Sequence, residues 1–156
     1  MNISNQNEPT VERISELELV VTHIVNAPAR LVWQAWTTPE LFRQWWVPKS
    51  FPITLLSCEM DVRIGGQYKL VFPFENSTME FFGTYVEVEP TSRLVWTNDE
   101  GEAGQTVTTV TFEEIDGKTK LSVLNQYPSK EALEADGSTA ALPESLDQLE
   151  VLLASR

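Results

Sequence analysis

The sequence predicts an α+β domain in which a curved antiparallel sheet of about six to seven strands wraps around a long C-terminal helix. Three observations lead to this prediction. Runs of strand-forming residues with short turn signals between them fill residues 55–126, two short helical segments precede them, and an amphipathic segment follows them. Strands joined by short turns pair antiparallel, and the final helix is expected to cover one face of their sheet.

The beginning of the chain predicts a leader and a first strand. Residues 1–13 are polar and contain an early proline, which is typical of a flexible N-terminal leader. We expect a single domain over residues 14–156. Residues 16–25 read ELELVVTHIV, and their many β-branched side chains predict the first strand.

Two short helices in tandem are expected next. Pro28 suits the first turn of a helix, where its missing N–H costs little. Pro39 can begin a second helix with Thr38 as its N-cap, and Pro48 follows the end of that helix. The apolar side chains expected on the buried faces of these helices are Leu31, Val32, Ala35, Trp36, Leu41, Phe42, Trp45 and Trp46.

The middle of the chain predicts about six consecutive strands. They cover residues 55–63, 67–74, 79–88, 93–97, 106–114 and 119–126. The pairs Gly65-Gly66 and Asp116-Gly117 are strong signals for hairpin turns. Residues 98–105 are acidic and contain glycine, so we expect a mobile loop there.

The C-terminal part of the chain returns to a helical period. Ser129 can cap a helix over residues 130–135, and Pro143 is expected to kink or restart the helix that follows. One apolar stripe of this last helix consists of Leu142, Leu146, Leu149 and Leu153.

Charge and cysteine content limit the classes of partner and site. The chain has 11 Lys and Arg against 23 Asp and Glu, a formal charge of −12, which repels nucleic acid and anionic lipid. We therefore expect neither nucleic acid nor a membrane as partner. Cys58 is the only cysteine, so an internal disulfide is excluded. The first residues lack the features of a signal peptide, and a cytoplasmic protein is expected.

The residues also resemble a known family. The motif AP-x2-LVW-x-AWT-x-PEL-x3-WW-x-P over residues 27–48 resembles the opening of the family named after the activator of Hsp90 ATPase, within the Bet v 1/START-related superfamily. The resemblance spans residues 17–154 and implies the helix-grip fold. Its further positions are Asp61, Gly65, Gly66, Gly83, Tyr85, the segment from Pro90 to Trp96 and the closing SLDQLEVLL.

The resemblance implies a cavity between the C-terminal helix and the sheet that accepts small hydrophobic molecules. We expect no cofactor. Relatives often carry Gly-Trp where this chain has Leu142-Pro143, and a histidine near Asn125-Gln126, so the pocket mouth is reshaped and a titratable group is lost. Packed core remains an alternative for the same rings. The residues expected to line the cavity are Trp36, Trp46, Phe72, Phe74, Phe82, Tyr85, Trp96, Phe112, Leu124, Leu142 and Leu146.

The polar candidates do not assemble a catalytic site. His23 is the only histidine, and without a partner it is interpreted as a strand-face residue. Cys58 is expected to be a structural thiol. Glu59 and Asp61 share a strand face, where solvation or an ion pair with Arg63 is expected. With no nucleophile, phosphate or metal motif present, we expect a binding protein rather than an enzyme.

Three functions follow, of which binding of a small apolar molecule leads. The second is a co-chaperone of an Hsp90-type chaperone in a stress response, which requires an exposed apolar or charged patch. We expect the chain to be a monomer or a homodimer. The third is a cofactor-free cyclase or hydrolase acting on an aromatic substrate. It requires a polar group inside the cavity, which would have to be Tyr85, Glu59 or Asn125.

Overall fold

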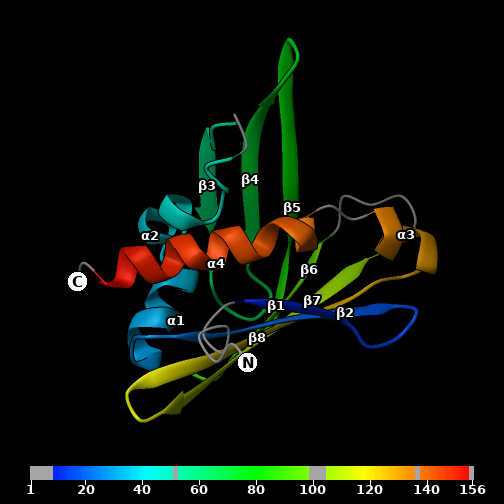
Figure 1. The fold of residues 1–156 in the computed structure, drawn as a ribbon. Coiled ribbons are helices and arrows are strands. Elements are labelled where there is room, and N and C mark those ends of the chain that lie inside the picture. The colour runs from blue at the N-terminus through cyan, green and yellow to red at the C-terminus, as the bar shows by residue number, and fades with distance from the viewer. Residues whose placement is uncertain (1–8, 51–52, 99–104, 136–137, 155–156) are drawn as a thin grey trace.

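The structure is a computed structural model that describes residues 9–50, 53–98, 105–135 and 138–154. Within these ranges eight strands and four helices follow one another (Figure 1). In chain order they are β1 (Thr10–Arg13), β2 (Glu18–Val25), α1 (Ala29–Thr37), α2 (Pro39–Trp45), β3 (Ser57–Met60), β4 (Gln67–Phe74), β5 (Ser77–Glu89), β6 (Arg93–Asn98), β7 (Thr106–Ile115), β8 (Lys118–Gln126), α3 (Lys130–Ala135) and α4 (Ser138–Ala154).

The strands form one antiparallel sheet in the order β1-β2-β8-β7-β6-β5-β4-β3. This confirms the predicted α+β class, with two short helices before the strand series and a long helix after it. Asp116 and Gly117 both have positive φ, at 54° and 81°, as the tight turn between β7 and β8 requires. The sheet has eight strands in the described ranges rather than six to seven.

The additional strand is β1, which lies inside the segment predicted to be a leader. Thr10 to Arg13 pair with β2 from Thr22 to Leu19, and the Thr10 and Thr22 hydroxyl oxygens are 2.7 Å apart. All four β1 side chains are exposed because the strand forms the edge of the sheet. An edge strand without a buried face has no apolar alternation, so its sequence gives no strand signal. The first eight residues lie outside the described part.

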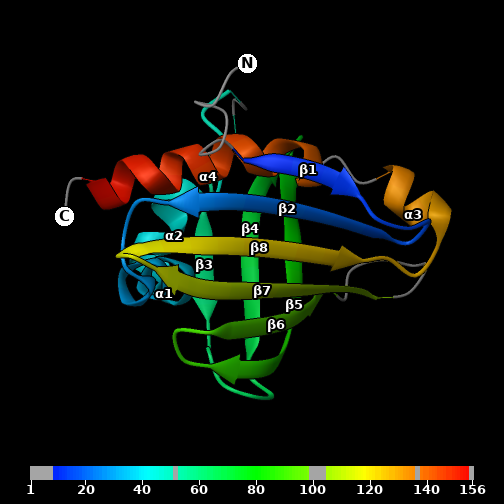
Figure 2. The same cartoon turned by 60° about the horizontal axis from the view of Figure 1, so that its bottom comes forward.

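The sheet turns sharply between its two parts. Strands β2, β8 and β7 run beneath α4, while β3, β4 and β5 run across their direction and extend beyond α4 (Figures 1 and 2). A Cβ added to Gly83 on β5 would come within 1.6 Å of the Thr97 carbonyl oxygen on β6. The pairing of β5 with β6 also shifts register between Tyr85 and Glu87. The bend therefore depends on a glycine and a bulge.

The N-termini of the two short helices are not capped by local side chains. Pro28 occupies the N-cap of α1, one residue before the helix, and the Ala29 N–H donates to Glu114 Oε1 on β7 at 2.9 Å. Thr38 occupies the predicted N-cap of α2, but its hydroxyl makes no capping hydrogen bond. Its carbonyl accepts from the Leu41 N–H instead. By contrast, Ser129 Oγ accepts from the Ala132 N–H, as predicted for α3.

Helix α4 closes the core. It continues from Ser138 to Ala154 through Pro143, where a kink or a restart was predicted. The predicted leucine stripe is buried, and α4 packs on β1 and β2 and on α1 and α2. None of the helices in the described ranges has the length and apolar character needed to cross a bilayer.

Candidate functional site

The inner face of the sheet is the face that carries α4, and strand alternation decides which side chains reach it. On β4 these are Tyr68, Leu70 and Phe72, all buried. On β5 they are Met79, Phe81, Gly83 and Tyr85. The first three pair with Phe72, Leu70 and Tyr68, and Tyr85 belongs to the same buried core. The outer face carries the residues between them.

Trp36 of α1 lies at the centre of an aromatic cluster on this inner face. The rings with centroids within 6.3 Å of the Trp36 ring are Phe42, Trp45, Trp46, Trp96 and Phe112. Trp45 donates its Nε1–H to the Ala35 carbonyl at 2.9 Å. Trp36 Nε1 is also buried but has no hydrogen-bond partner in the described part of the chain. These aromatic rings therefore pack against one another on the face where a cavity was predicted.

Most of the predicted lining residues meet in the core, but three do not. The residues that gather there are Trp36, Phe72, Tyr85, Trp96, Phe112, Leu142 and Leu146, with Trp46 packed against them. Phe82 is 41% exposed on the outer face, next to inward-facing Phe81. Leu124 alternates with buried Val123 and also points outward. Phe74 ends β4 and is 51% exposed, although it shares its face with Phe72.

Apolar side chains of β3 to β5 form a connected patch on the inner face. We call Cys58, Met60, Leu70, Phe72 and Phe81 the inner-face patch. Cys58 pairs with Leu70, Leu70 pairs with Phe81, and the Phe72 and Phe81 rings are 5.5 Å apart. Leu70 and Phe72 are buried, whereas Cys58, Met60 and Phe81 are only partly buried although they pack against the core. The patch therefore combines a buried floor with an accessible rim.

Two tyrosines beside the patch differ in their hydrogen bonding. Their ring centroids are 5.8 Å apart. The Tyr68 hydroxyl donates to the Thr97 carbonyl at 3.1 Å and also contacts Asn98 Oδ1. Tyr85 is 3% exposed, and its hydroxyl makes no hydrogen bond to any described residue. Burial, followed by the nearby Cys58 and Asp61, raises the pKa of Tyr85, so its phenol stays protonated.

Cys58 is a neutral thiol in this environment. Burial raises its pKa, while the positive charge of Arg43 opposes this and Glu40 adds to it. The Cys58 thiol lies 3.7 Å from the Met60 sulfur. A raised pKa lowers the thiolate fraction at neutral pH, so the group behaves as an apolar wall rather than a nucleophile.

The other polar candidates have structural partners. His23 Nε2 lies 2.7 Å from Glu150 Oε1, and Thr108 donates to Asn125 Oδ1 at 2.6 Å. Glu59 is exposed on the outer face, and Asp61 pairs with Arg63 at 2.8 Å, as predicted. Among the described residues no three His, Cys, Asp or Glu side chains gather as a metal site requires.

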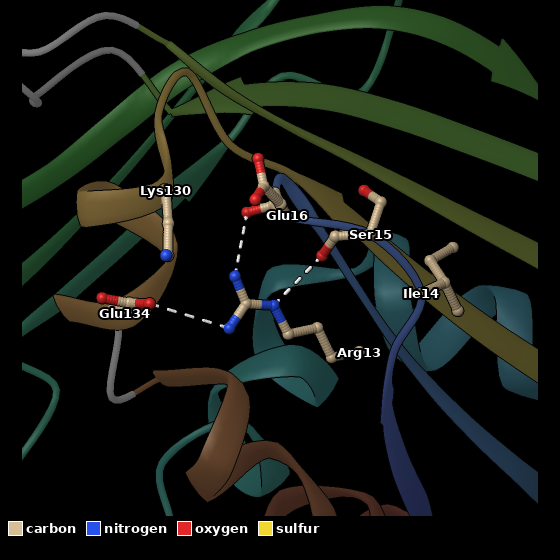
Figure 3. A pocket seen from close by; sticks show the side chains of 6 residues that line it. All are labelled: Arg13, Ile14, Ser15, Glu16, Lys130 and Glu134. Carbon is tan, nitrogen blue, oxygen red and sulfur yellow. Dashed lines mark hydrogen bonds and ion pairs between the residues drawn. The ribbon is translucent and has the colours of Figure 1, made fainter.

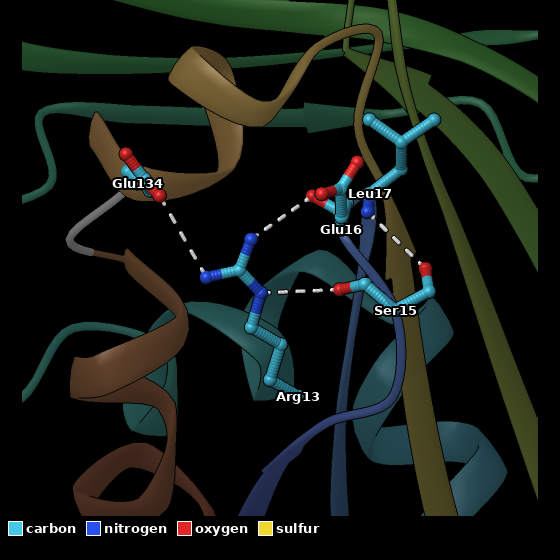
Figure 4. Close-up of polar contacts among 5 residues, drawn as sticks. All are labelled: Arg13, Ser15, Glu16, Leu17 and Glu134. Atoms are coloured by element: carbon cyan, nitrogen blue, oxygen red, sulfur yellow. Dashed lines mark hydrogen bonds and ion pairs between the residues drawn. The ribbon is translucent and has the colours of Figure 1, made fainter.

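A pocket of about 470 Å³ lies where the turn after β1 faces α3 (Figure 3). Arg13 dominates it, donating to the carbonyls of Ser15 and Glu16 at 3.1 and 3.3 Å and approaching Glu134 to 3.7 Å (Figure 4). The guanidinium is thus already engaged in joining the β1–β2 turn to α3. We interpret this pocket as structural.

A smaller pocket of about 260 Å³ lies on β3 to β5, and its exposed side chains belong to the outer face of the sheet. Its lining residues are Glu59, Gln67, Tyr68, Lys69, Phe82 and Gly83. Phe82 is the one predicted lining residue that reaches either of these two pockets. Glu59 and Lys69 give this pocket charged side chains beside the Phe82 ring, and Lys69 also pairs with Glu80 at 3.5 Å.

Three side chains of α4 hold the segment that follows α2. We call Glu144, Ser145 and Gln148 the α4 clamp. Ser145 Oγ donates to the Trp46 carbonyl at 2.7 Å, and Gln148 Nε2 donates to the Trp45 and Val47 carbonyls at 3.0 and 2.9 Å. These bonds satisfy carbonyls that the end of a helix leaves unpaired.

The acidic member of the clamp holds the next turn of the same segment. The Ser50 hydroxyl and N–H donate to Glu144 at 2.6 and 3.0 Å, and the Lys49 N–H donates to Gln148 Oε1 at 2.7 Å. Each partner lies about a hundred residues from the other along the chain. Such separation leaves no local sequence signal, so the clamp was not predicted.

The chain matches a family model over residues 26–154, that of the activator of Hsp90 ATPase homolog 1-like protein. The chain belongs to this family. The family predicted from the motif over residues 27–48 is thereby confirmed. A comparison with curated proteins found no match. Membership places the chain among ligand-binding or cochaperone-like proteins and specifies neither a ligand nor a partner.

Solved bacterial structures share the fold of this activator-like chain. A protein from Nitrosomonas europaea is 25% identical, with a TM-score of 0.79 over 92% of this chain and 97% of that one. A Rhodobacter sphaeroides protein is 24% identical, with a TM-score of 0.83 over 96% and 100%. One from Chromobacterium violaceum is 27% identical, with a TM-score of 0.71 over 88% and 97%.

Proposed function

We propose that this chain binds a small, mostly apolar molecule at the inner-face patch. The observation that carries the proposal is the accessible rim of the patch, where Cys58, Met60 and Phe81 stay partly exposed while facing the core side of the sheet. A connected apolar surface that remains in contact with water marks a binding surface more often than an isolated exposed side chain does.

The position of the patch favours a small occupant. Strands β3 to β5 extend beyond α4, so the helix covers only part of their length (Figure 1). The aromatic cluster around Trp36 packs deeper on the same face, so the accessible apolar side chains of the patch are those of its rim, Cys58, Met60 and Phe81. A molecule lying there would bury apolar surface, and each Å² buried would contribute about 25 cal/mol to the free energy of binding.

Two adjacent phenylalanines on opposite faces of β5 test the proposal. The unmodified chain is screened by thermal shift against aromatic polyketides, flavonoids, fatty acids and sterols, and a ligand raises Tm with dose. Phe81→Ala is expected to remove most of this shift because Phe81 belongs to the patch. Phe82→Ala, the matched control on the outer face, is expected to keep it.

Two outcomes would contradict the proposal. One is a full thermal shift in Phe81→Ala, which would place the ligand away from the patch. The other is a loss in Phe82→Ala alone, which would place it in the outer pocket beside Lys69.

Family membership supports a second function, as a cochaperone-like protein. The measurement is ATP turnover of an Hsp90-type chaperone with increasing amounts of this chain. A change that saturates would support the function, and unchanged turnover over a wide concentration range would count against it.

A further inference from the structure

We infer that the molecule held at the inner-face patch is uncharged and carries an acceptor oxygen that receives a hydrogen bond from the Tyr85 hydroxyl. This inference rests on the proposed function and specifies the chemistry of its ligand.

The first argument is the unused donor. Tyr85 is almost fully buried, yet its hydroxyl has no hydrogen bond to any described residue. The hydroxyl oxygen is not among the buried atoms that lack a partner, so water reaches it and a bound molecule can take the place of that water. An acceptor oxygen on a bound molecule would supply that partner. Neighbouring Tyr68 lacks this property, because its hydroxyl already donates to Thr97.

The second argument is the position of Tyr85. It pairs across the sheet with Trp96, and its ring lies 5.8 Å from that of Tyr68. Cys58 of the inner-face patch is close enough to influence the ionisation of Tyr85. A molecule on the patch would therefore have apolar atoms against Phe81 and an oxygen near the phenol.

The third argument is charge. The pKa of Tyr85 is raised, so the phenol remains a donor at every physiological pH. The carboxylate of Asp61 also acts on this group, and the whole chain carries a charge of −12. Arg63 pairs with Asp61, so the net charge of the chain is what disfavours an anionic head group, whereas a ketone, ester or ether oxygen carries no charge to be repelled.

Three naphthalenes of similar size separate these possibilities. The probes are 2-acetylnaphthalene with a neutral carbonyl, 2-ethylnaphthalene without an acceptor, and 2-naphthoate with a carboxylate. Affinities are measured by isothermal titration calorimetry on the unmodified chain, on Tyr85→Phe and on Tyr68→Phe. The Tyr68 variant is the matched control because it loses a hydroxyl that is already bonded within the fold.

The expected result is that 2-acetylnaphthalene binds most tightly. Tyr85→Phe is expected to weaken its binding about fivefold to tenfold, the size of one neutral hydrogen bond, and to leave 2-ethylnaphthalene unchanged. Tyr68→Phe is expected to preserve the ratio between the affinities for 2-acetylnaphthalene and 2-ethylnaphthalene.

Tightest binding of 2-naphthoate, or equal weakening of both neutral probes by Tyr85→Phe, would overturn the inference. In either case the proposed function would stand, provided that Phe81→Ala abolishes binding. If none of the three probes binds to the unmodified chain, both the inference and the proposed function are overturned.

Discussion

His23 is buried on β2, at 3% exposure, and it faces α4. Its Nε2 lies 2.7 Å from Glu150 Oε1, and because an ionised carboxylate only accepts, Nε2 carries the proton. The other ring nitrogen, Nδ1, is buried without a partner in the described part of the chain. This contact joins the inner face of the sheet to the last turns of α4.

Removal of Glu150 tests the role of this contact. Glu150→Leu leaves both imidazole nitrogens unpaired, so the free energy of unfolding is expected to fall by about 1–3 kcal/mol in urea denaturation. The double variant His23→Leu, Glu150→Leu is expected to recover part of this loss because it buries no unpaired group. Equal stability of Glu150→Leu and the unmodified chain would show that the contact contributes nothing.

Glu144 gives a prediction that depends on pH. The Ser50 hydroxyl and N–H donate to its carboxylate and lower the pKa of Glu144. A lowered pKa means that the contact stabilises the fold above the ordinary glutamate pKa and is lost as pH falls through the lowered value. NMR titration of Glu144 is expected to show this low pKa, and Ser50→Ala to bring it part of the way back. An ordinary pKa in the unmodified chain would contradict the contact.

At the scale of elements, α4 serves two purposes. Its leucine stripe covers the sheet, and its clamp fixes the backbone after α2 through bonds to Trp45, Trp46 and Val47. The second purpose matters for the site because it holds the Trp46 ring, which is stacked on Phe42 at 4.7 Å. A side-chain amide on one helix thus stabilises the C-terminus of another.

Replacement of Gln148 tests the clamp. Gln148→Ala leaves two carbonyls and the Lys49 N–H without these partners, and the expected loss is about 2 kcal/mol in the free energy of unfolding. The control is Asp147→Ala, an exposed position on the same helix, where a change within about 0.5 kcal/mol is expected. Similar losses in both variants would mean that helix propensity, rather than the clamp, is being measured.

Elements with strong local patterns were predictable, and elements defined by tertiary contacts were not. The bounds of β4 and α3 match the predicted residues 67–74 and 130–135. For the candidate site, alternation places Phe81 and Phe82 on opposite faces, but sequence alone cannot tell which face is covered. Phe82 was predicted as a lining residue, and the structure places it on the outer face of β5. The N-terminus of α1 likewise depends on Glu114, which lies 85 positions away.

At the scale of the whole molecule, the bend between the two parts of the sheet requires Gly83. Gly83→Ala would force a Cβ against the Thr97 carbonyl. We expect the free energy of unfolding, measured by urea denaturation, to fall by about 3 kcal/mol. Gly117→Ala is the comparison, because a Cβ there meets no atom within 4 Å and only the positive φ of 81° opposes it. Its expected loss is about 1–2 kcal/mol. A loss for Gly83→Ala no greater than this would contradict the close contact.

The charge of −12 predicts a salt response of the entire fold. Raising NaCl from about 10 mM to about 150 mM shortens the range of electrostatic repulsion from about 30 Å to about 8 Å. Because repulsion between like charges is greater in the compact state, Tm is expected to rise with salt. Calorimetry with NaCl and KCl should give the same rise, and a falling Tm would mean that attractive pairs dominate.

The pairing of β2 with β8 has a consequence for synthesis. Glu18 and Gln126 lie side by side although they are 108 positions apart. At ribosomal rates this separation corresponds to roughly 5–20 s during which β2 has been made and β8 has not. Throughout that interval Val21 and Val25 of β2 have no β8 residues to pair with. In a nascent chain halted before Lys118, β2 therefore has no β8 to pair with, and the emergence of β8 ends that state.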